Sequence, residues 1–492
     1  MVMPVAVPVA DGSRWAGTDD PSGMTVAAGP GGDKVAYGGA ITNRHTGPLY
    51  GSASPYGTAI RARRTYGSGP PYGPVGSGPH TGPPPPYIPR TVGTMSPSAS
   101  PRPRIDAAQR RARLGHRHRL TASVKAVTAE EVADALLGLH ATDAATVHLS
   151  LRARLADPNP AALDRALYED RTLVRMLCMR RTLFAVSTTL APVIAGASAA
   201  PVATKERRDL TKWITEGLPD WDERRLAEVE ERTLAALEVR GEATAADLAA
   251  DVPELRTTLV SFPGKSYEAT VAISSRILRA LAAEGRIRRG RPRGGWTSSS
   301  FRWVPGTAFT DLDAPEPAEA RAQLARHWLA SYGPATTDDL KWWTGWTLTD
   351  TRRAAAAAGA VEVDLPESPA PGLALPDDLA PVPEPAPWAA LLPALDPTAM
   401  GWKSRDWYLD PDHTRPLFDR SGNIGPTVWW NGRIIGAWAQ RPDGDITWHL
   451  LTDAGQEATE AVRTEAERLR EWIGGVRVTP RFRTPLEREL SA

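Results

Sequence analysis

Apolar residues recur at helical intervals in several segments of the chain, and these intervals predict where helices and strands lie. The elements predicted first are helices over 129–139 and 161–168, followed by strands over 173–179 and 182–187. Thr128 is a hydroxyl N-cap candidate, and Glu131 stands three residues on, which is the spacing of a capping box. Two helices followed by a hairpin predict a winged-helix-like first domain.

The same succession of helices and strands is predicted twice more. The second set comprises helices over 221–240, 245–251 and 266–284, with strands over 286–289 and 299–304 separated by 290–295. The third set comprises helices over 317–332, 337–343 and 347–358, with a strand over 361–365. Segments 241–248 and 333–340 share the pattern Gly-x-Ala-Thr. That pattern is also a common helix start, but its return in matching context indicates two repeats of one module.

The C-terminal part predicts a sheet covered by a helix. After a proline-rich connection over 366–387, strands are predicted over 427–430, 433–440 and 446–451, and an amphipathic helix over 454–472. Asn431-Gly432 and Asp443-Gly444 are strong signals for tight turns between such strands.

Residues 1–104 are rich in Gly, Pro, Ser and Thr, and we expect them to be disordered because they cannot bury enough apolar surface. Met95 could be an internal start site. The predicted fold class is α+β, with tandem winged-helix domains and a C-terminal β-rich domain with a covering helix. The predicted domains are a disordered extension (1–104), three winged-helix-like units (105–220, 221–310 with the basic wing, and 311–387 with the linker) and the C-terminal domain (388–492).

Composition limits the function classes. The formal net charge is only +1, so an argument for nucleic acid must rest on local patches. Cys178 is the only cysteine, which excludes a disulfide within the chain, and its apolar surroundings predict a buried, inert thiol. We see no signal peptide and no apolar run of the roughly 20 residues that a membrane span needs. We expect a soluble, cytoplasmic, nucleoid-associated monomer.

A basic, glycine-broken wing over 286–303 is the first candidate site. Its first eleven residues hold five arginines and no acid, and arginine forks suit phosphate oxygens. The alternative is a solvated basic hairpin without a partner, but the unrelieved repulsion favours double-stranded DNA as the partner. The predicted DNA contacts are Arg286, Arg288, Arg289, Arg291, Arg293, Trp296 and Arg302. A second basic run is either another phosphate contact or a solvated arm; it comprises Arg110, Arg111, Arg113, Arg117 and Arg119.

The segment 138–143 is the candidate catalytic site, because His140, Thr142 and Asp143 bring together an imidazole, a hydroxyl and a carboxylate. A base and a hydroxyl can hold and polarise a water molecule. The spacing alone favours the alternative, in which Thr142 or Asp143 caps the next helix and His140 is structural. His148, nearby, has the same two interpretations.

The acidic run near the C-terminal part lacks a recognised metal-ligand spacing, so we interpret it as structural and predict no metal site; it comprises Asp396, Asp406, Asp410 and Asp412, with His413. The chain contains no Gly-x-x-x-x-Gly-Lys, His-Glu-x-x-His or Gly-x-Ser-x-Gly motif. ATPase, zinc-protease and α/β-hydrolase functions therefore lose their usual support, and we predict no nucleotide cofactor.

Taken together, these segments resemble the bacterial winged-helix DNA glycosylases of the AlkZ and YcaQ type over nearly all of 105–490. The resemblance is carried, in order, by 136–143, 149–154, 181–183, 290–297, 333–336, 391–396, 415–418 and 426–428. It implies tandem winged helices, a C-terminal β-rich part, and cofactor-free excision of N7-alkylated purines, including bulky or cross-linked ones.

The resemblance also implies a catalytic pair, Gln-x-Gln or Gln-x-Asp, that holds the attacking water. Here the matching positions are His140 and Thr142, which departs from that pattern. Neutral His140 could accept a proton from water and Thr142 could orient the water, but Thr142 supplies no negative charge. Two functions follow: a monofunctional DNA glycosylase for alkylated or bulky purines in repair or genotoxin resistance, or a non-catalytic winged-helix DNA-binding protein or regulator.

Overall fold

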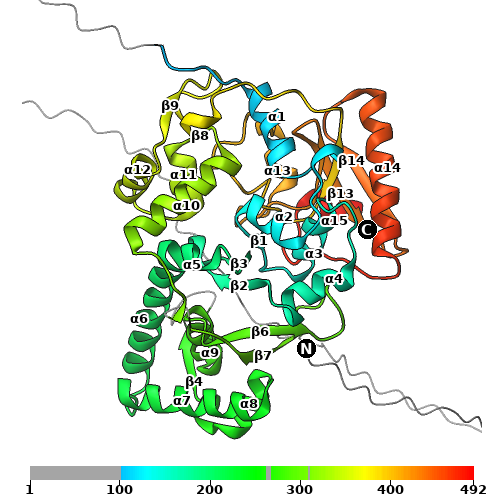
Figure 1. Cartoon of the computed structure of the whole chain (residues 1–492). Coiled ribbons are helices and arrows are strands. Elements are labelled where there is room, and N and C mark those ends of the chain that lie inside the picture. The colour runs from blue at the N-terminus through cyan, green and yellow to red at the C-terminus, as the bar shows by residue number, and fades with distance from the viewer. Residues whose placement is uncertain (1–100, 262–267, 309–310) are drawn as a thin grey trace, which may run out of the picture. The chain divides into compact units, whose positions relative to one another are not determined.

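The computed structural model describes residues 101–492, apart from 262–267 and 309–310. Helices alternate with short strands, and in the described part the strands form five small antiparallel sheets (Figure 1). This is an α+β fold, as predicted. No helix of the described residues has the length and apolar character that crossing a membrane requires.

The predicted disordered extension lies outside the described residues, except for residues 101–104. Those four residues are placed: Arg102 forms an ion pair with Glu362, and Arg104 forms a parallel bridge with Asp364. Ile105 is buried in a small cluster with Val363 and its neighbours. Residues 101–104 of the predicted extension are therefore not disordered.

The first part carries the candidate catalytic segment. Its elements are α2 (Ala129–Leu136), β1 (Leu139–His140), α3 (Ala144–Arg152), α4 (Pro160–Asp164), β2 (Leu173–Leu177) and β3 (Leu183–Ser187). The Thr128 hydroxyl accepts the Glu131 N–H at 3.2 Å, so Thr128 is the N-cap, as predicted. The Glu131 carboxylate accepts the Val127 N–H instead of that of Thr128, so the predicted capping box is only half formed. Helix α2 is shorter than predicted because Leu137 and Gly138 have φ of 54° and 112°. These left-handed residues end the helix and turn the chain into β1.

The second part contains the basic wing. Its elements are α5 (Ala191–Ile194), α6 (Ala200–Gly217), α7 (Glu223–Arg240), α8 (Ala245–Asp251), β4 (Thr258–Ser261), β5 (Ala269–Ala272), α9 (Ser274–Ala283), β6 (Ile287–Pro292) and β7 (Phe301–Pro305). We call β6, β7, the turn between them and the preceding Arg286 the basic hairpin. The predicted helix over 266–284 is wrong in its first part: β5 pairs there with β4, and the β-branched Thr270 and Val271 suit a strand.

The third part resembles the second in its local structure. Its elements are α10 (Pro317–Tyr332), β8 (Ala335–Thr336), α11 (Thr337–Thr344), α12 (Leu348–Ala357), β9 (Val361–Val363) and β10 (Gly372–Ala374). Thr244 before α8 and Thr336 before α11 both form complete capping boxes, with Asp247 and Asp339. The predicted connection over 366–387 is wrong in part, because it contains β10, which pairs with both β8 and β9.

One strand order recurs in these three parts. The first sheet runs β1-β3-β2 and the third runs β8-β10-β9. In the second part, Ala243 bridges Trp303 of β7, and β7 pairs with β6. Each time, a short segment between two helices pairs with the last strand of the part, and that strand also pairs with the strand before it.

The run of arginines that the sequence offered as a phosphate contact or a solvated arm forms neither. Four of its five arginines belong to α1 (Ala107–Arg117), where Arg110 and Arg113 are buried and Arg111 and Arg117 are partly exposed. Arg110 is 4% exposed and pairs with Glu367, while Arg113 donates to the carbonyl of Ala380. Arg111 and Arg117 also donate to backbone carbonyls, those of Trp407 and Gly333. Arg119, just beyond the helix, donates to the Val124 carbonyl.

The C-terminal part is a sheet with a covering helix, as predicted (Figure 1). Its elements are β11 (Ala389–Leu392), α13 (Thr414–Leu417), β12 (Thr427–Trp430), β13 (Arg433–Gln440), β14 (Ile446–Leu450), α14 (Gly455–Ile473) and α15 (Pro485–Leu490). Val462 and Leu469 of α14 pack in one cluster with Val428 and Trp438 of the sheet.

The largest apolar cluster joins the first, third and C-terminal parts, and contains Met176, Trp328 and Trp429. Cys178 lies in it with 0% exposure, and burial raises the pKa of its thiol to about 12. This confirms the predicted burial of the thiol. Leu137 before β1 and Phe184 opposite His140 belong to this cluster, so the candidate segment packs against a core that several parts of the chain share.

Candidate functional site

His140 ends the short strand β1, opposite Phe184 of β3. Its ring lies 5.6 Å from the Phe184 ring, and the side chain is only 7% exposed. The Nδ1 atom is buried and has no hydrogen-bond partner among the described residues. Burial, and then the charge of Arg180, lower the pKa of His140 to about 3. The imidazole is therefore neutral near pH 7 and can exchange hydrogen bonds with a water molecule.

Thr142 and Asp143 complete the turn between β1 and α3. Thr142 is partly exposed. Asp143 caps α3: one carboxylate oxygen accepts the Ala145 N–H at 3.2 Å, and the other accepts the Arg481 N–H at 2.9 Å. Burial raises the pKa of Asp143, although the two backbone hydrogen bonds act to lower it. Asp143 thus positions the turn, in line with the capping role that the sequence left open.

His148 lies on α3, one to two turns beyond Asp143. Its Nε2 is 3.1 Å from Asp164 Oδ1, and its ring stacks on Trp296 of the basic hairpin with centroids 5.3 Å apart. Trp296 also lies 5.5 Å from the Trp472 ring of α14. Trp296, predicted as a DNA contact, is thus packed between the first and C-terminal parts.

Several arginines of the basic hairpin have carboxylate partners that the sequence did not predict. Arg286, Arg291 and Arg302 form ion pairs with Glu231, Glu169 and Glu242, none of which belongs to the hairpin. The expectation that no compensating acid lies nearby is therefore wrong, because folding brings these acids from other segments. All three ion pairs are at least partly exposed. The carboxylates therefore relieve the repulsion between the arginines but add little to the stability of the fold.

The remaining hairpin arginines have other surroundings. The guanidinium of Arg289 lies 4.4 Å from the Phe301 ring centroid. Arg288 is half-buried, and burial followed by the charge of Arg171 lowers its pKa. Arg293 is exposed beside Gly294, at a turn open enough that a Cβ on Gly294 would meet nothing within 4 Å.

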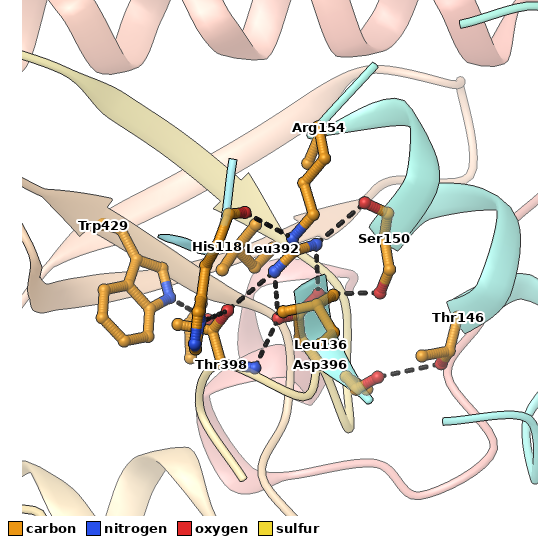
Figure 2. Close-up of polar contacts among 12 residues, drawn as sticks. His118, Leu136, Thr146, Ser150, Arg154, Leu392, Asp396, Thr398 and Trp429 are labelled. Carbon is orange, nitrogen blue, oxygen red and sulfur yellow. Dashed lines mark hydrogen bonds and ion pairs between the residues drawn. The ribbon is translucent and has the colours of Figure 1, made fainter. Parts of the chain in front are cut away.

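A buried polar network that the sequence did not predict holds α3 against the C-terminal part. Figure 2 shows Arg154 and Asp396 at its centre, both with fully buried side chains and paired at 2.7 Å. Ser150 donates to Asp396, and Arg154 donates to Thr398 and to the carbonyl of His118. Burial alone would raise the pKa of Asp396, but Arg154 and these hydrogen bonds outweigh it and lower the pKa.

This network supports the candidate turn without being open to a substrate. Thr146, near the start of α3, adds a hydrogen bond of 2.8 Å to the Ala394 carbonyl. The preference for a structural role of Asp396 is in line with this geometry. In sequence, the only signal for Arg154 was its place in one of the resembling segments. The described residues contain no group of three or more His, Cys, Asp or Glu side chains arranged for a metal ion.

The amino-acid sequence matches one known protein family over most of its length. The model of a family described as "DNA glycosylase AlkZ-like" matches residues 133–472. The chain belongs to the AlkZ-like DNA glycosylase family. The matched range of this AlkZ-like protein begins in α2 and ends in α14, so it includes the candidate turn, the basic hairpin and the Arg154–Asp396 pair.

A solved structure agrees with this assignment. The DNA glycosylase AlkZ of Streptomyces sahachiroi is similar to this chain at a TM-score of 0.58 and 22% identity, over 76% of this chain and 98% of that one. At this identity the likeness shows the fold. No curated protein matches the sequence.

Proposed function

We propose that this AlkZ-like protein binds double-stranded DNA and hydrolyses the bond between deoxyribose and an alkylated or bulky purine, in DNA repair or genotoxin resistance. In this reaction the water oxygen bonds to C1′, and the C1′–N9 bond breaks with its electron pair going to the base. The water's proton passes to solvent. An N7-alkylated purine already carries a positive charge, so it departs as a neutral base and needs no acid.

The observation that supports this proposal is the buried, neutral Nδ1 of His140, which lacks a partner in the described structure. It stands at the position where the resemblance puts the first member of the catalytic pair. His140 would hold the attacking water and Thr142 would orient it. Asp143 would position both residues, through its bonds to the N–H groups of Ala145 and Arg481.

We also propose that the three sheets with a common strand order belong to three winged-helix units over 105–220, 221–310 and 311–387, followed by the domain 388–492. DNA would then run along the basic hairpin. Arg288, Arg289 and Arg293 would contact its phosphates. The partly exposed ion pairs of Arg286, Arg291 and Arg302 would exchange their carboxylates for phosphates. We expect a monomer that acts at the nucleoid.

A second candidate is a DNA-binding protein or regulator without catalysis. It is favoured by the low pKa of His140, because so weak a base takes a proton from water poorly. Thr142 also supplies no negative charge to stabilise a cationic sugar. The described residues of the turn thus hold water more readily than they activate it.

The deciding experiment measures release of free base from duplex DNA that contains a defined N7-alkylguanine, beside binding of the same duplex. We expect release by the full chain and its loss in His140→Ala, with Thr142→Val as a nearly isosteric second variant. Retained DNA binding by both variants distinguishes lost chemistry from lost folding. Binding without release, across a panel of alkylated and bulky purines, would leave only the second candidate.

A further inference from the structure

Two arginines that the sequence did not single out share one aromatic side chain. Arg180 lies in the turn between β2 and β3, and its guanidinium carbon is 3.9 Å from the centroid of the Trp342 ring of α11. Arg405 lies in the loop between β11 and α13, 5.1 Å from the same ring. Arg405 also lies 5.3 Å from the Phe418 ring. Folding therefore brings two positive charges to one indole from distant parts of the chain.

Neither arginine has a carboxylate partner among the described residues, unlike the buried Arg154 and Arg110. The Nε atoms of Arg180 and Arg405 are both buried without a hydrogen-bond partner. Burial, then the charge of Arg405, lower the pKa of Arg180 to about 10, so it still carries its proton near pH 7. Cation–π contact offsets part of the repulsion, but it leaves these N–H donors unused.

The backbone holds Arg180 in an unusual conformation. Its φ is 53° and that of Arg181 is 60°, in the left-handed region that costs free energy for residues other than glycine. Gly345, at the end of α11, approaches this turn so closely that a Cβ there would lie 3.3 Å from Arg180 Cγ. Such a conformation persists where the surroundings impose it, which is typical of a binding site.

The arginine pair lies beside the candidate turn. The charge of Arg180 contributes to the low pKa of His140. Phe184 connects the two regions, because its ring lies 5.6 Å from that of His140 and 6.4 Å from that of Trp343, the neighbour of Trp342. A DNA strand that brings a nucleotide to His140 would therefore carry its neighbouring phosphates past Arg180.

We propose that Arg180 and Arg405 form a site for an oxyanion, and that its ligand is a DNA phosphate next to the nucleotide held at His140. This assignment of the ligand rests on the proposed function. Guanidinium forks match the oxygens of a phosphodiester, and one such group between the two arginines would neutralise their repulsion. A free phosphate offers the same chemistry, so the experiment separates the two sources.

The test measures the dissociation constant of an undamaged duplex at several salt concentrations. In the variant Arg180→Gln with Arg405→Gln we expect about tenfold weaker binding at low salt. The slope of log affinity against log salt is negative and should become shallower by about 0.9, which corresponds to the loss of one phosphate contact. Arg180→Lys with Arg405→Lys keeps both charges and should keep the slope. Arg463→Gln with Arg468→Gln, at two exposed sites on α14, is the matched control for two lost charges.

An unchanged slope in a folded Gln variant would overturn the proposal. If that double variant does not fold, the single variant Arg405→Gln and the Lys pair give the same comparison. Inorganic phosphate is titrated in parallel. Loss of phosphate binding with unchanged DNA binding would overturn the DNA assignment in favour of a free phosphate. None of these measurements depends on base release. A shallower slope would therefore still support a phosphate contact at Arg180 and Arg405 even if the catalytic proposal fails.

Discussion

Trp296 of the basic hairpin stacks on His148 of α3, with ring centroids 5.3 Å apart. The contact fastens the turn of the hairpin to the helix whose first turn Asp143 caps. An ion pair between Arg291 and Glu169 adds a second attachment. The segment predicted to grip DNA is therefore coupled directly to the helix that positions the candidate catalytic residues.

Trp296→Ala should loosen the basic hairpin while leaving the rest of the fold intact. The stacked pair contributes about 0.5–1.5 kcal/mol beyond its buried area, so amide exchange in β6 and β7 should become about three- to tenfold faster. Hydrogen exchange followed by mass spectrometry measures this. Arg293→Ala, at the exposed turn, is the control and should leave protection unchanged. Equal protection in wild type and Trp296→Ala would mean that the stacking does not hold the hairpin.

Asp396→Asn should destabilise the protein strongly, because it leaves the fully buried guanidinium of Arg154 without its carboxylate. Breaking one side of a buried ion pair costs about 3–5 kcal/mol. Urea denaturation at pH 7 should show a lower midpoint with an unchanged slope. Asp445→Asn, which removes the exposed partner of Arg470, should leave the midpoint unchanged. A similar small effect for both variants would contradict the central role of the Arg154–Asp396 pair.

Acidification below pH 6.5 should lower stability, because His118 and His140 stay neutral in the folded state. Burial, and then nearby arginines, lower the pKa of each to about 3, whereas an unfolded histidine has a pKa of about 6.5. The unfolded state therefore takes up protons first, as the pH falls from 6.5 towards 3. Each residue should contribute a loss of about 1.4 kcal/mol per pH unit.

Unfolding free energies between pH 7.5 and 5 measure this dependence. The His118 ring lies within hydrogen-bond distance of the Thr398 hydroxyl, at 2.8 Å from Nδ1 to Oγ1. His118→Gln keeps a hydrogen-bonding side chain for Thr398 and should reduce the slope by about 1.4 kcal/mol per pH unit. His449→Gln changes an exposed histidine and should keep the wild-type slope. A wild-type stability that is independent of pH over this range would show that the two histidines are not buried as neutral groups.

Local signals in the sequence predicted much of the fold. The hydroxyl caps at Thr128, Thr244 and Thr336 all form, because a cap depends only on residues within one helical turn. The turn at Asn431 also forms between β12 and β13, for the same reason. By contrast, the helix predicted over 266–284 begins as strand β5, because its pairing with β4 outweighs local periodicity.

Long-range partners could not be predicted in this way. In the sequence, Arg110 is consistent with a solvated arm. In the structure it is buried and forms an ion pair with Glu367, from a distant segment. Likewise Arg180 is one basic residue among many until folding places it against Trp342. Charge in a sequence shows where arginines are, whereas only the fold shows which of them keep donors unused.

Replacing His140 and Thr142 together with glutamine tests the candidate turn most directly, since it restores the Gln-x-Gln pair that the resemblance associates with catalysis. Asp143 and the cap of α3 remain, so the new side chains enter a turn that is already fixed. A positioned group that assists proton transfer contributes about 10²- to 10⁴-fold to a rate. We therefore expect faster release of N7-methylguanine from duplex DNA in single-turnover assays, with unchanged DNA affinity. His140→Phe with Thr142→Val fills the same space without hydrogen bonding and should abolish release. If the glutamine pair and the apolar pair release base equally, the turn after β1 is not where this protein activates water.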